Sequence, residues 1–150
     1  MRVLIIEDGN EYLDSLSRFV PGPVYLQAHD AEEALRVLEG GGIDLVYLDM
    51  RFDRIASDRL VGDFAQALAA CNGEEERAWK YLQNHQGLFI LAHLAAQGYS
   101  ALPVLISYDF GQELRRFGLL KRTYPHLDWV GDGAGPDEIR RKMHQAIQAP

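Results

Sequence analysis

The sequence predicts an α/β fold: a doubly wound, five-stranded parallel sheet of order 2-1-3-4-5 with an extra helical segment after the third strand. Three observations lead to this prediction. Short apolar runs recur along the chain, and stretches of helical periodicity separate them, which is typical of a parallel sheet covered on both faces. Two of the runs end in acidic residues. The interval that follows the third run is much longer than one crossover needs.

The first half of the chain alternates between strands and helices. Residues 2–6 (RVLII) form a continuous apolar run followed by acids, as expected of a buried parallel strand. Asp30 is predicted to cap the second helix, and Glu33 three residues later completes a capping box. The predicted strands of this half are 2–6, 24–28 and 44–48, and the predicted helices cover 12–20 and 31–39.

The second half continues the alternation. Leucines and alanines at helical spacing predict a helix that begins near residue 88 and is ended by Gly98. Pro136 is predicted to open the last helix, because proline is favoured in a first helical turn. The other predicted elements of this half are strands at 102–107 and 127–130 and a helix at 111–121.

The middle of the chain is longer than the fold requires. Residues 50–106 lie between Asp49, which follows the third predicted strand, and Ser107, which ends the fourth, whereas a whole βαβ unit needs only about 30 residues. Residues 53–84 are therefore predicted to be an insertion within a single domain of residues 1–150. Trp79, Tyr81 and several leucines can bury one face of a helix. We expect two short helices here, separated by the break at 71–73.

Composition excludes several classes of protein. The net charge of −7 argues against a nucleic-acid-binding surface, which needs a basic patch. Cys71 is the only cysteine, so an intrachain disulfide and a multi-cysteine metal site are both impossible. No apolar run approaches the roughly 20 residues that cross a membrane. We expect a cytoplasmic protein with neither nucleic-acid nor membrane partners.

Acidic residues follow two strands that are neighbours in the predicted sheet. Glu7 and Asp8 follow the first strand and Asp49 follows the third, so all three reach the edge where open α/β sheets bind ligands. Three carboxylates at one place favour a bound cation, and oxygen ligands suit Mg²⁺. A metal-neutralised aspartate can accept a phosphoryl group. The alternative, that these acids end their strands separately in solvent, stays open.

Longer stretches resemble a known family. The segments RVLIIED, AHDAEEALRVLEGGGIDLVYLDM and QGLFILAHLAAQGYSALPVLIS are similar, in this order, to the receiver domain of bacterial two-component response regulators, which is flavodoxin-like in fold. The resemblance covers nearly the whole chain apart from the insertion. It implies a signalling function in which a sensor kinase or a downstream signalling protein is the partner.

The resemblance also implies roles for individual residues. Asp49 would be the phosphoacceptor, and Asp8 with Glu7 would organise Mg²⁺ together with Asp49. The backbone carbonyl of Arg51 would be a further metal ligand. Ser107 would supply the hydroxyl that binds the phosphoryl group when the domain switches. Tyr108 is a competing alignment for this last role, because Ser107 comes four residues after Pro103, where the family usually has one more.

Two departures from the family pattern concern charge. The family places a lysine after the fifth strand, but the sequence here reads DWVGDG, with Gly131 or Asp132 at that place. The proline usual after the acceptor is replaced by Asp53. Both changes make the pocket more negative. The added negative charge lowers the stability of a phosphoryl group on Asp49 and favours metal binding alone. Arg54 is a possible replacement for the missing cation, since arginine binds phosphate well; Arg51 and Arg59 offer the same chemistry.

Three functions follow from these features. The first is a stand-alone receiver with atypical or absent phosphorylation; since the chain ends with the last predicted helix, its output is expected to pass through a partner protein. The second is a pseudo-receiver, a binding module independent of phosphorylation. The third is a small Mg²⁺-dependent phosphatase-like enzyme with Asp53 as its second acid. We expect a protein that is not an enzyme and has no catalytic residue. The sequence predicts no oligomeric state.

Overall fold

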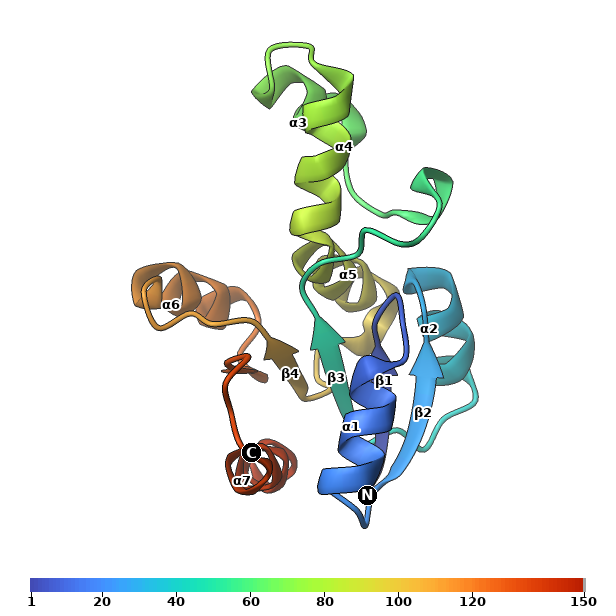
Figure 1. The fold of residues 1–150 in the computed structure, drawn as a ribbon, viewed down its shortest axis with the longest axis vertical. Helices are drawn as coiled ribbons and strands as arrows, with labels where there is room; N and C mark the ends of the chain where they lie inside the picture. Colours follow the sequence, from blue (N-terminus) through green and yellow to red (C-terminus); the bar gives the residue numbers. More distant parts are fainter. Residues whose placement is uncertain (150) are drawn as a thin grey trace.

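The computed structural model describes residues 1–149 and confirms the predicted fold class. Five parallel strands form one sheet in the order β2-β1-β3-β4-β5 (Figure 1). The strands are β1 (Arg2–Ile6), β2 (Val24–Ala28), β3 (Leu45–Asp49), β4 (Val104–Ser107) and β5 (Leu127–Val130). Within the described residues, no helix combines the length and apolar character that crossing a membrane requires.

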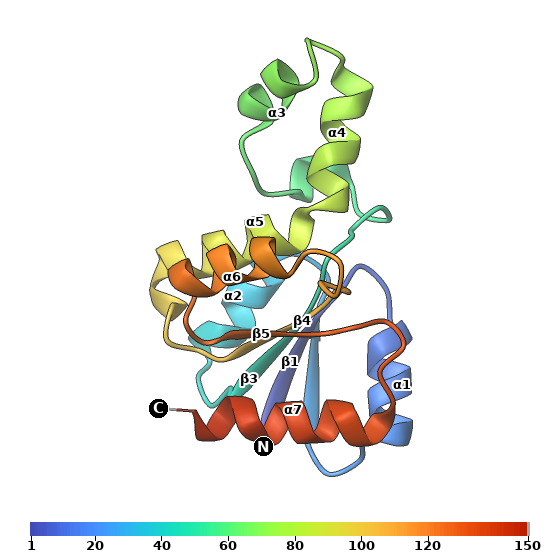
Figure 2. The same cartoon turned by 90° about the vertical axis from the view of Figure 1, so that its left-hand side faces the viewer.

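Helices cover both faces of the sheet (Figure 2). The helices α1 (Glu11–Phe19) and α7 (Pro136–Gln148) lie on one face. The other face carries α2 (Ala31–Glu39), α5 (Gln86–Leu94), which continues as a π-helical turn at Ala95–Tyr99, and α6 (Leu114–Thr123). Alternate residues of each central strand face opposite sides, as the pleat requires. Both faces are therefore dry, which explains why the strands are continuous apolar runs.

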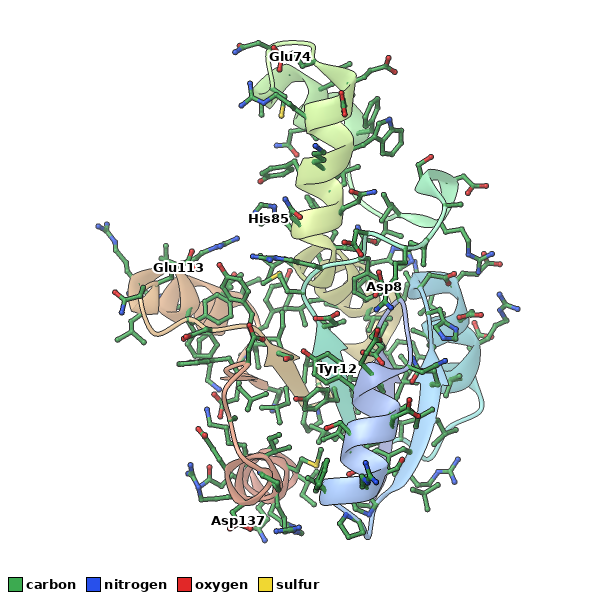
Figure 3. All side chains as sticks on the ribbon, in the orientation of Figure 1. Asp8, Tyr12, Glu74, His85, Glu113 and Asp137 are labelled. Carbon is green, nitrogen blue, oxygen red and sulfur yellow. The ribbon has the colours of Figure 1, made fainter. Side chains whose placement is uncertain are left out.

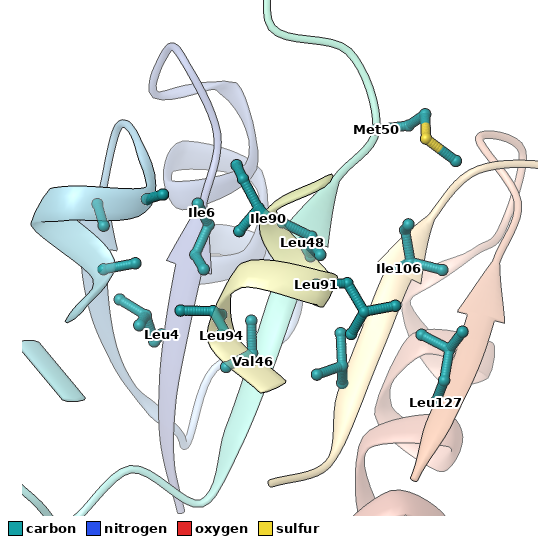
Figure 4. Close-up of a cluster of buried hydrophobic side chains, with 14 of the residues drawn as sticks. Leu4, Ile6, Val46, Leu48, Met50, Ile90, Leu91, Leu94, Ile106 and Leu127 are labelled. Atoms are coloured by element: carbon teal, nitrogen blue, oxygen red, sulfur yellow. The ribbon is translucent and has the colours of Figure 1, made fainter. Parts of the chain in front are cut away.

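The larger of the two cores lies beneath α5. Leu4, Ile6, Val46 and Leu48 of the central strands are completely buried there. The α5 residues Ile90, Leu91 and Leu94 pack onto them (Figure 4). Burying side chains of this kind contributes about 1.5–3 kcal/mol each, so this contact fixes α5, the helix that follows the insertion, on the sheet.

Several element boundaries differ from the predictions by a few residues, and three of the differences have a clear local cause. β3 ends with Asp49 itself, because Asp49 still pairs with Ser107. β4 begins at Val104 instead of 102, since the Leu102 N–H closes a turn onto the Tyr99 carbonyl. α6 begins at Leu114 instead of 111, because the Asp109 carboxylate accepts the Gly111 N–H and holds the preceding residues in a turn.

The predicted cap of α2 is present with one change. The Asp30 carboxylate accepts a hydrogen bond from the Glu33 N–H at 2.9 Å. The Glu33 carboxylate, however, accepts from the His29 N–H at 2.6 Å, one residue before the cap. Asp30 also receives the guanidinium of Arg59. Arg59, a candidate for phosphate contact from the sequence, therefore anchors the insertion to α2.

The insertion forms a helical hairpin, as predicted. A short 3₁₀ helix (Ser57–Arg59) is followed by α3 (Phe64–Ala70) and α4 (Glu75–Asn84), and the hairpin projects from the carboxyl edge of the sheet above α5 (Figure 1). It has a small core of its own in which Ala67, Ala78 and Leu82 are buried. The rings of Phe64 and Trp79 stack on this core with centroids 4.1 Å apart.

Gln86 joins the hairpin to the rest of the fold. Its side chain is completely buried, accepts the Val61 N–H at 2.8 Å and donates to the Val61 carbonyl at 2.9 Å. It also donates to the Leu82 carbonyl at 3.2 Å. A buried amide that satisfies both polar groups of a loop residue fixes that loop in one position. The start of α5 thus holds the incoming and outgoing segments of the insertion together.

Candidate functional site

An open pocket lies at the carboxyl edge of the sheet, where the sequence predicted a site. It brings together residues from four segments: the ends of β1, β3 and β4 and the loop after β5. Most of the site residues predicted from the sequence line it. The lining residues are Asp8, Asp49, Met50, Arg51, Asp53, Arg54, Ser107, Tyr108, Asp109 and Asp132.

Asp49 occupies the centre of this edge. It is the last residue of β3 and pairs with Ser107 of β4, and one of its carboxylate oxygens accepts the Met50 N–H at 2.8 Å. Burial, reinforced by the nearby carboxylates of Glu7, Asp8 and Asp132, raises the pKa of Asp49 to about 7. Asp49 is therefore partly protonated at neutral pH, unlike an ordinary surface aspartate.

Asp8 is held by the start of the insertion. Its side chain is only 2% exposed. One carboxylate oxygen accepts the backbone N–H groups of Asp53 and Arg54, each at 2.9 Å, and the other accepts Nη2 of Arg54 at 3.1 Å. Figure 3 shows Asp8 at the carboxyl edge, above the turn of α1 that carries Tyr12. Three donors from one loop thus surround this carboxylate.

Glu7 and Glu11 take different partners. Glu7 is 1% exposed and its carboxylate accepts the Tyr12 N–H at 2.8 Å, so it caps the start of α1; burial raises its pKa. Glu11 forms two hydrogen bonds with the guanidinium of Arg54, at 2.6 and 2.9 Å, and this contact lowers the pKa of Glu11 to about 2. Glu7 does not line the pocket.

The two candidates for the switch hydroxyl lie differently. Ser107 is 3% exposed, stands beside Asp49 in the sheet, and its Oγ lies 2.7 Å from the hydroxyl of Tyr12. The hydroxyl of Tyr108 donates to the Glu113 carboxylate at 2.5 Å, on the side of α6. Ser107 is therefore the better placed of the two for contact with a group on Asp49.

The pocket contains two acids in the region where the resemblance expects a lysine. Asp132 follows β5 and Asp109 follows β4, and both line the pocket. Lys142, on α7, instead donates to the Trp129 carbonyl at 2.5 Å and lies 4.9 Å from the centre of the Trp129 ring. The guanidinium of Arg51 forms no ion pair within residues 1–149.

Sequence reasoning missed three residues of this site. Asp109 could have been found, because it lies two residues beyond the end of a predicted strand at the same edge. Tyr12 begins the helix predicted over 12–20 and was given no role in the site, although its hydroxyl reaches Ser107. Glu11 offered no local signal, since its role depends on Arg54, which is 43 residues away in the chain.

The arrangement of these groups does not fit a hydrated magnesium ion. Mg²⁺ needs several oxygen ligands and usually keeps part of its water shell. The Arg51 carbonyl accepts no backbone hydrogen bond within residues 1–149, but the Asp8 carboxylate is buried and already bound by Arg54. Across the same residues, no group of three histidine, cysteine, aspartate or glutamate side chains is placed to hold a metal ion. Magnesium binding stays a prediction of the sequence.

Comparison with known proteins identifies the fold. No protein-family model and no curated protein matches this sequence. Among solved structures, the receiver domain of NtrX from Brucella abortus is similar, with a TM-score of 0.64, 18% identity and coverage of 99% of both chains. The chain has the fold of a response regulator receiver domain.

Other solved receivers agree. The receiver domain of the Francisella response regulator 1452 matches with a TM-score of 0.62, 16% identity and coverage of 98% of this chain and 96% of that one. A receiver domain protein from Clostridium thermocellum matches with a TM-score of 0.63, 17% identity and coverage of 97% and 93%. A longer NtrX chain, in complex with ATP, is covered over 27% of its length.

The receiver fold explains the alternation of the chain outside the insertion. Each strand except the last is followed by one helix that returns to the sheet, and α7 follows the last strand. The helix that completes the crossover after β3 is α5, because it packs on the sheet core. The 3₁₀ helix, α3 and α4 are therefore additional to the five βα units.

Proposed function

We propose that this chain is a receiver-type signalling module that works through protein contacts and does not use phosphorylation of Asp49 as its switch. One observation carries the proposal. Asp132 lies in the pocket with Asp49, where the receiver pattern expects a lysine, and it contributes to the raised pKa of Asp49. A negative charge at this place opposes the chemistry that the lysine would support.

The balance of charge in the pocket supports this proposal. A phosphoryl group on Asp49 brings nearly two further negative charges. Asp8, Asp53, Asp109 and Asp132 line the same pocket, and like charges at close range oppose one another. Arg54 lies nearby, but its guanidinium is bound to Asp8 and Glu11. In addition, a partly protonated Asp49 is a weaker nucleophile than a carboxylate.

The hydroxyl of Ser107 is also engaged. In the receiver pattern this group would turn to the phosphoryl oxygen. Here its Oγ and the Tyr12 hydroxyl lie 2.7 Å apart, and Ser107 is almost completely buried. A phosphoryl group would have to replace this hydrogen bond, which reduces the gain from any switching movement.

Arg51 favours a second candidate function, an atypical receiver that is phosphorylated on Asp49. Arg51 lines the pocket, its residue is exposed, and arginine binds phosphate through two parallel hydrogen bonds. In this alternative, Arg51 would supply the cation that the missing lysine would otherwise provide.

A phosphatase-like enzyme is not proposed. Phosphate monoesters are anions, and the five aspartates that line the pocket outnumber its two arginines, so the pocket repels them. Asp53 is the second acid that such an enzyme would use. Its backbone N–H donates to the Asp8 carboxylate, so Asp53 helps to close the edge of the pocket. The partner that we propose is a protein, either a sensor kinase or a downstream signalling protein. The proposed contact surface consists of the α3–α4 hairpin together with α6, β5 and α7.

Treatment with acetyl phosphate tests the proposal. The protein and its Asp49→Asn variant are incubated with acetyl phosphate and Mg²⁺, and intact mass is followed over time. We expect slow or undetectable addition of phosphate to both proteins. Rapid, stoichiometric labelling of the wild type that the variant lacks would overturn the proposal. In that case, loss of labelling in Arg51→Gln would support the atypical receiver.

A further inference from the structure

The bridge between Asp8 and Arg54 is more than a surface ion pair. The Asp8 side chain is 2% exposed, whereas the Arg54 side chain is 51% exposed and reaches in from the insertion. Exposed ion pairs contribute little, but removing the partner of a buried carboxylate leaves an uncompensated charge. The pair with Arg54 therefore stabilises the Asp8 carboxylate more than a pair between two exposed side chains would.

One guanidinium serves two carboxylates. Arg54 binds Asp8 through Nη2 at 3.1 Å and Glu11 through both terminal nitrogens at 2.6 and 2.9 Å. The acids come from the β1–α1 loop and from the first turn of α1, while the cation comes from the insertion. Joining carboxylates of separate segments through a shared positive charge is the task that a divalent ion performs in an oxygen-lined site.

The chain leaves space for the guanidinium. An ideal Cβ on Gly9 would overlap Oε2 of Glu11 and Nη2 of Arg54 and would lie 2.7 Å from Cζ of Arg54, all closer than atoms can approach. Gly9 stands between Asp8 and the start of α1, and because it has no side chain, the Arg54 guanidinium and the Glu11 carboxylate can meet there. This observation is independent of the ion pairs and points to the same group.

We infer that Arg54 is an internal cation that takes the place of a divalent metal ion in this receiver fold, so that the pocket is assembled without metal. The backbone of the same loop adds two N–H donors to Asp8. Together these contacts satisfy the carboxylate and fasten the start of the insertion over the edge of the sheet. A metal ion could bind Asp8 only after this loop had moved away.

This inference does not depend on whether Asp49 is phosphorylated. Metal binding and phosphate labelling are separate measurements, and either can give the unexpected result alone. A protein that bound no Mg²⁺ but was labelled by acetyl phosphate would retain the inference and lose the proposed function.

The test compares Mg²⁺ binding by four proteins: wild type, Arg54→Gln, Gly9→Ala and the control Arg51→Gln. Each is titrated with MgCl₂ in a calorimeter and melted in EDTA and in MgCl₂. We expect wild type to melt at the same temperature in both solutions and to show no saturable heat. Arg54→Gln should melt lower in EDTA, recover in MgCl₂, and bind Mg²⁺ at least about tenfold more tightly than wild type, because a competing positive charge is gone.

Gly9→Ala and Arg51→Gln separate the effect of losing the bridge between Arg54 and Asp8 from the effect of losing a positive charge in the pocket. Gly9→Ala should behave like Arg54→Gln, because its methyl group overlaps both the guanidinium and the Glu11 carboxylate that binds it and so disrupts the bridge, while the charge of every acid is kept. Arg51→Gln removes the same charge from the same pocket without breaking an ion pair, and should behave like wild type. Saturable Mg²⁺ binding by wild type, or equal gains in Arg54→Gln and Arg51→Gln, would overturn the inference. If Arg54→Gln does not fold, wild type and Gly9→Ala decide the matter.

Discussion

The hydroxyl oxygen of Tyr12 lies 2.7 Å from Oγ of Ser107, which ties the first turn of α1 to the end of β4. Burial, aided by the nearby Asp49 carboxylate, raises the pKa of Tyr12 to about 12, so the tyrosine stays neutral. Its ring packs against Tyr47 of β3, with centroids 5.3 Å apart. Tyr12 thus connects α1 to the two strands that carry Ser107 and Tyr47.

Replacing Tyr12 by phenylalanine should reveal the value of this hydrogen bond. Tyr12→Phe leaves the buried Ser107 hydroxyl without its partner, and we expect the free energy of unfolding to fall by about 1 kcal/mol. Chemical denaturation measures the change. Tyr81→Phe is the control, because Tyr81 is 43% exposed and surface changes usually stay within about 0.5 kcal/mol. Equal losses in the two variants would contradict the prediction.

The raised pKa of Asp49 predicts a pH-dependent penalty on stability. The pKa is about 7 in the folded protein against an ordinary 3.8, so the folded state binds more protons between these values. The ionisation of Asp49 therefore lowers the free energy of unfolding as pH rises from about 4 to 7, and this loss is complete above pH 7. Asp49→Asn should therefore stabilise the protein by about 2 kcal/mol at pH 8, after allowance for solvent screening, and by less at pH 5.

Thermal or urea unfolding in EDTA at the two pH values measures this effect. The chelator removes any contribution from a bound cation. Asp58→Asn is the control, because Asp58 is an exposed residue outside the pocket and should change stability little at either pH. A gain from Asp49→Asn that was the same at pH 5 and pH 8 would show that titration of Asp49 is not its cause.

Gly87 is predicted to be irreplaceable at the start of α5. A Cβ there would overlap the Asp49 carbonyl oxygen and lie 2.9 Å from Cα of Met50, and backbone atoms cannot move aside as side chains can. We expect Gly87→Ala to cost about 3 kcal/mol of unfolding free energy. Gly118→Ala, in open space on α6, should instead stabilise by about 0.5–1 kcal/mol. Urea denaturation compares them, and similar losses in both would contradict the close packing at Gly87.

The hairpin should loosen independently of the sheet. Its core is separate from the two sheet cores, and Phe64→Ala removes the ring that stacks on Trp79, at a cost of about 3 kcal/mol to the hairpin. The two tryptophans report separately, since Trp129 lies on β5. We expect the Trp79 emission, measured in a Trp129→Phe background, to shift to longer wavelength.

The same Phe64→Ala change is also measured in a background that keeps only the tryptophan of the sheet. In Trp79→Phe, where Trp129 is the reporter, Phe64→Ala should leave the emission and the melting of the sheet almost unchanged. Phe19→Ala, which removes an aromatic ring that is 54% exposed on α1, should move neither reporter. Equal shifts of both tryptophans would mean that the hairpin and the sheet unfold as one unit.

The sequence by itself determined the architecture. The strands at 2–6, 24–28 and 127–130 match the observed ones at both ends, because burial on two faces leaves a continuous apolar run in the sequence. The helices of the insertion were predicted for a similar reason, from aromatic and leucine side chains that need a common face. The gathering of Asp8, Asp49 and Ser107 at one edge followed from the direction of parallel strands.

Only the tertiary structure decided which partner each charged group takes. Arg51 and Arg54 are three residues apart and chemically the same, yet Arg54 binds Asp8 and Glu11 while Arg51 lines the pocket. Glu7 and Asp8 are neighbours in the chain, yet one caps α1 and the other holds the insertion. Periodicity records which side chains are buried, since neighbouring residues share that pattern. An ion pair between residues 8 and 54 depends on the path of the loop and on the space left by Gly9, and no local pattern records either.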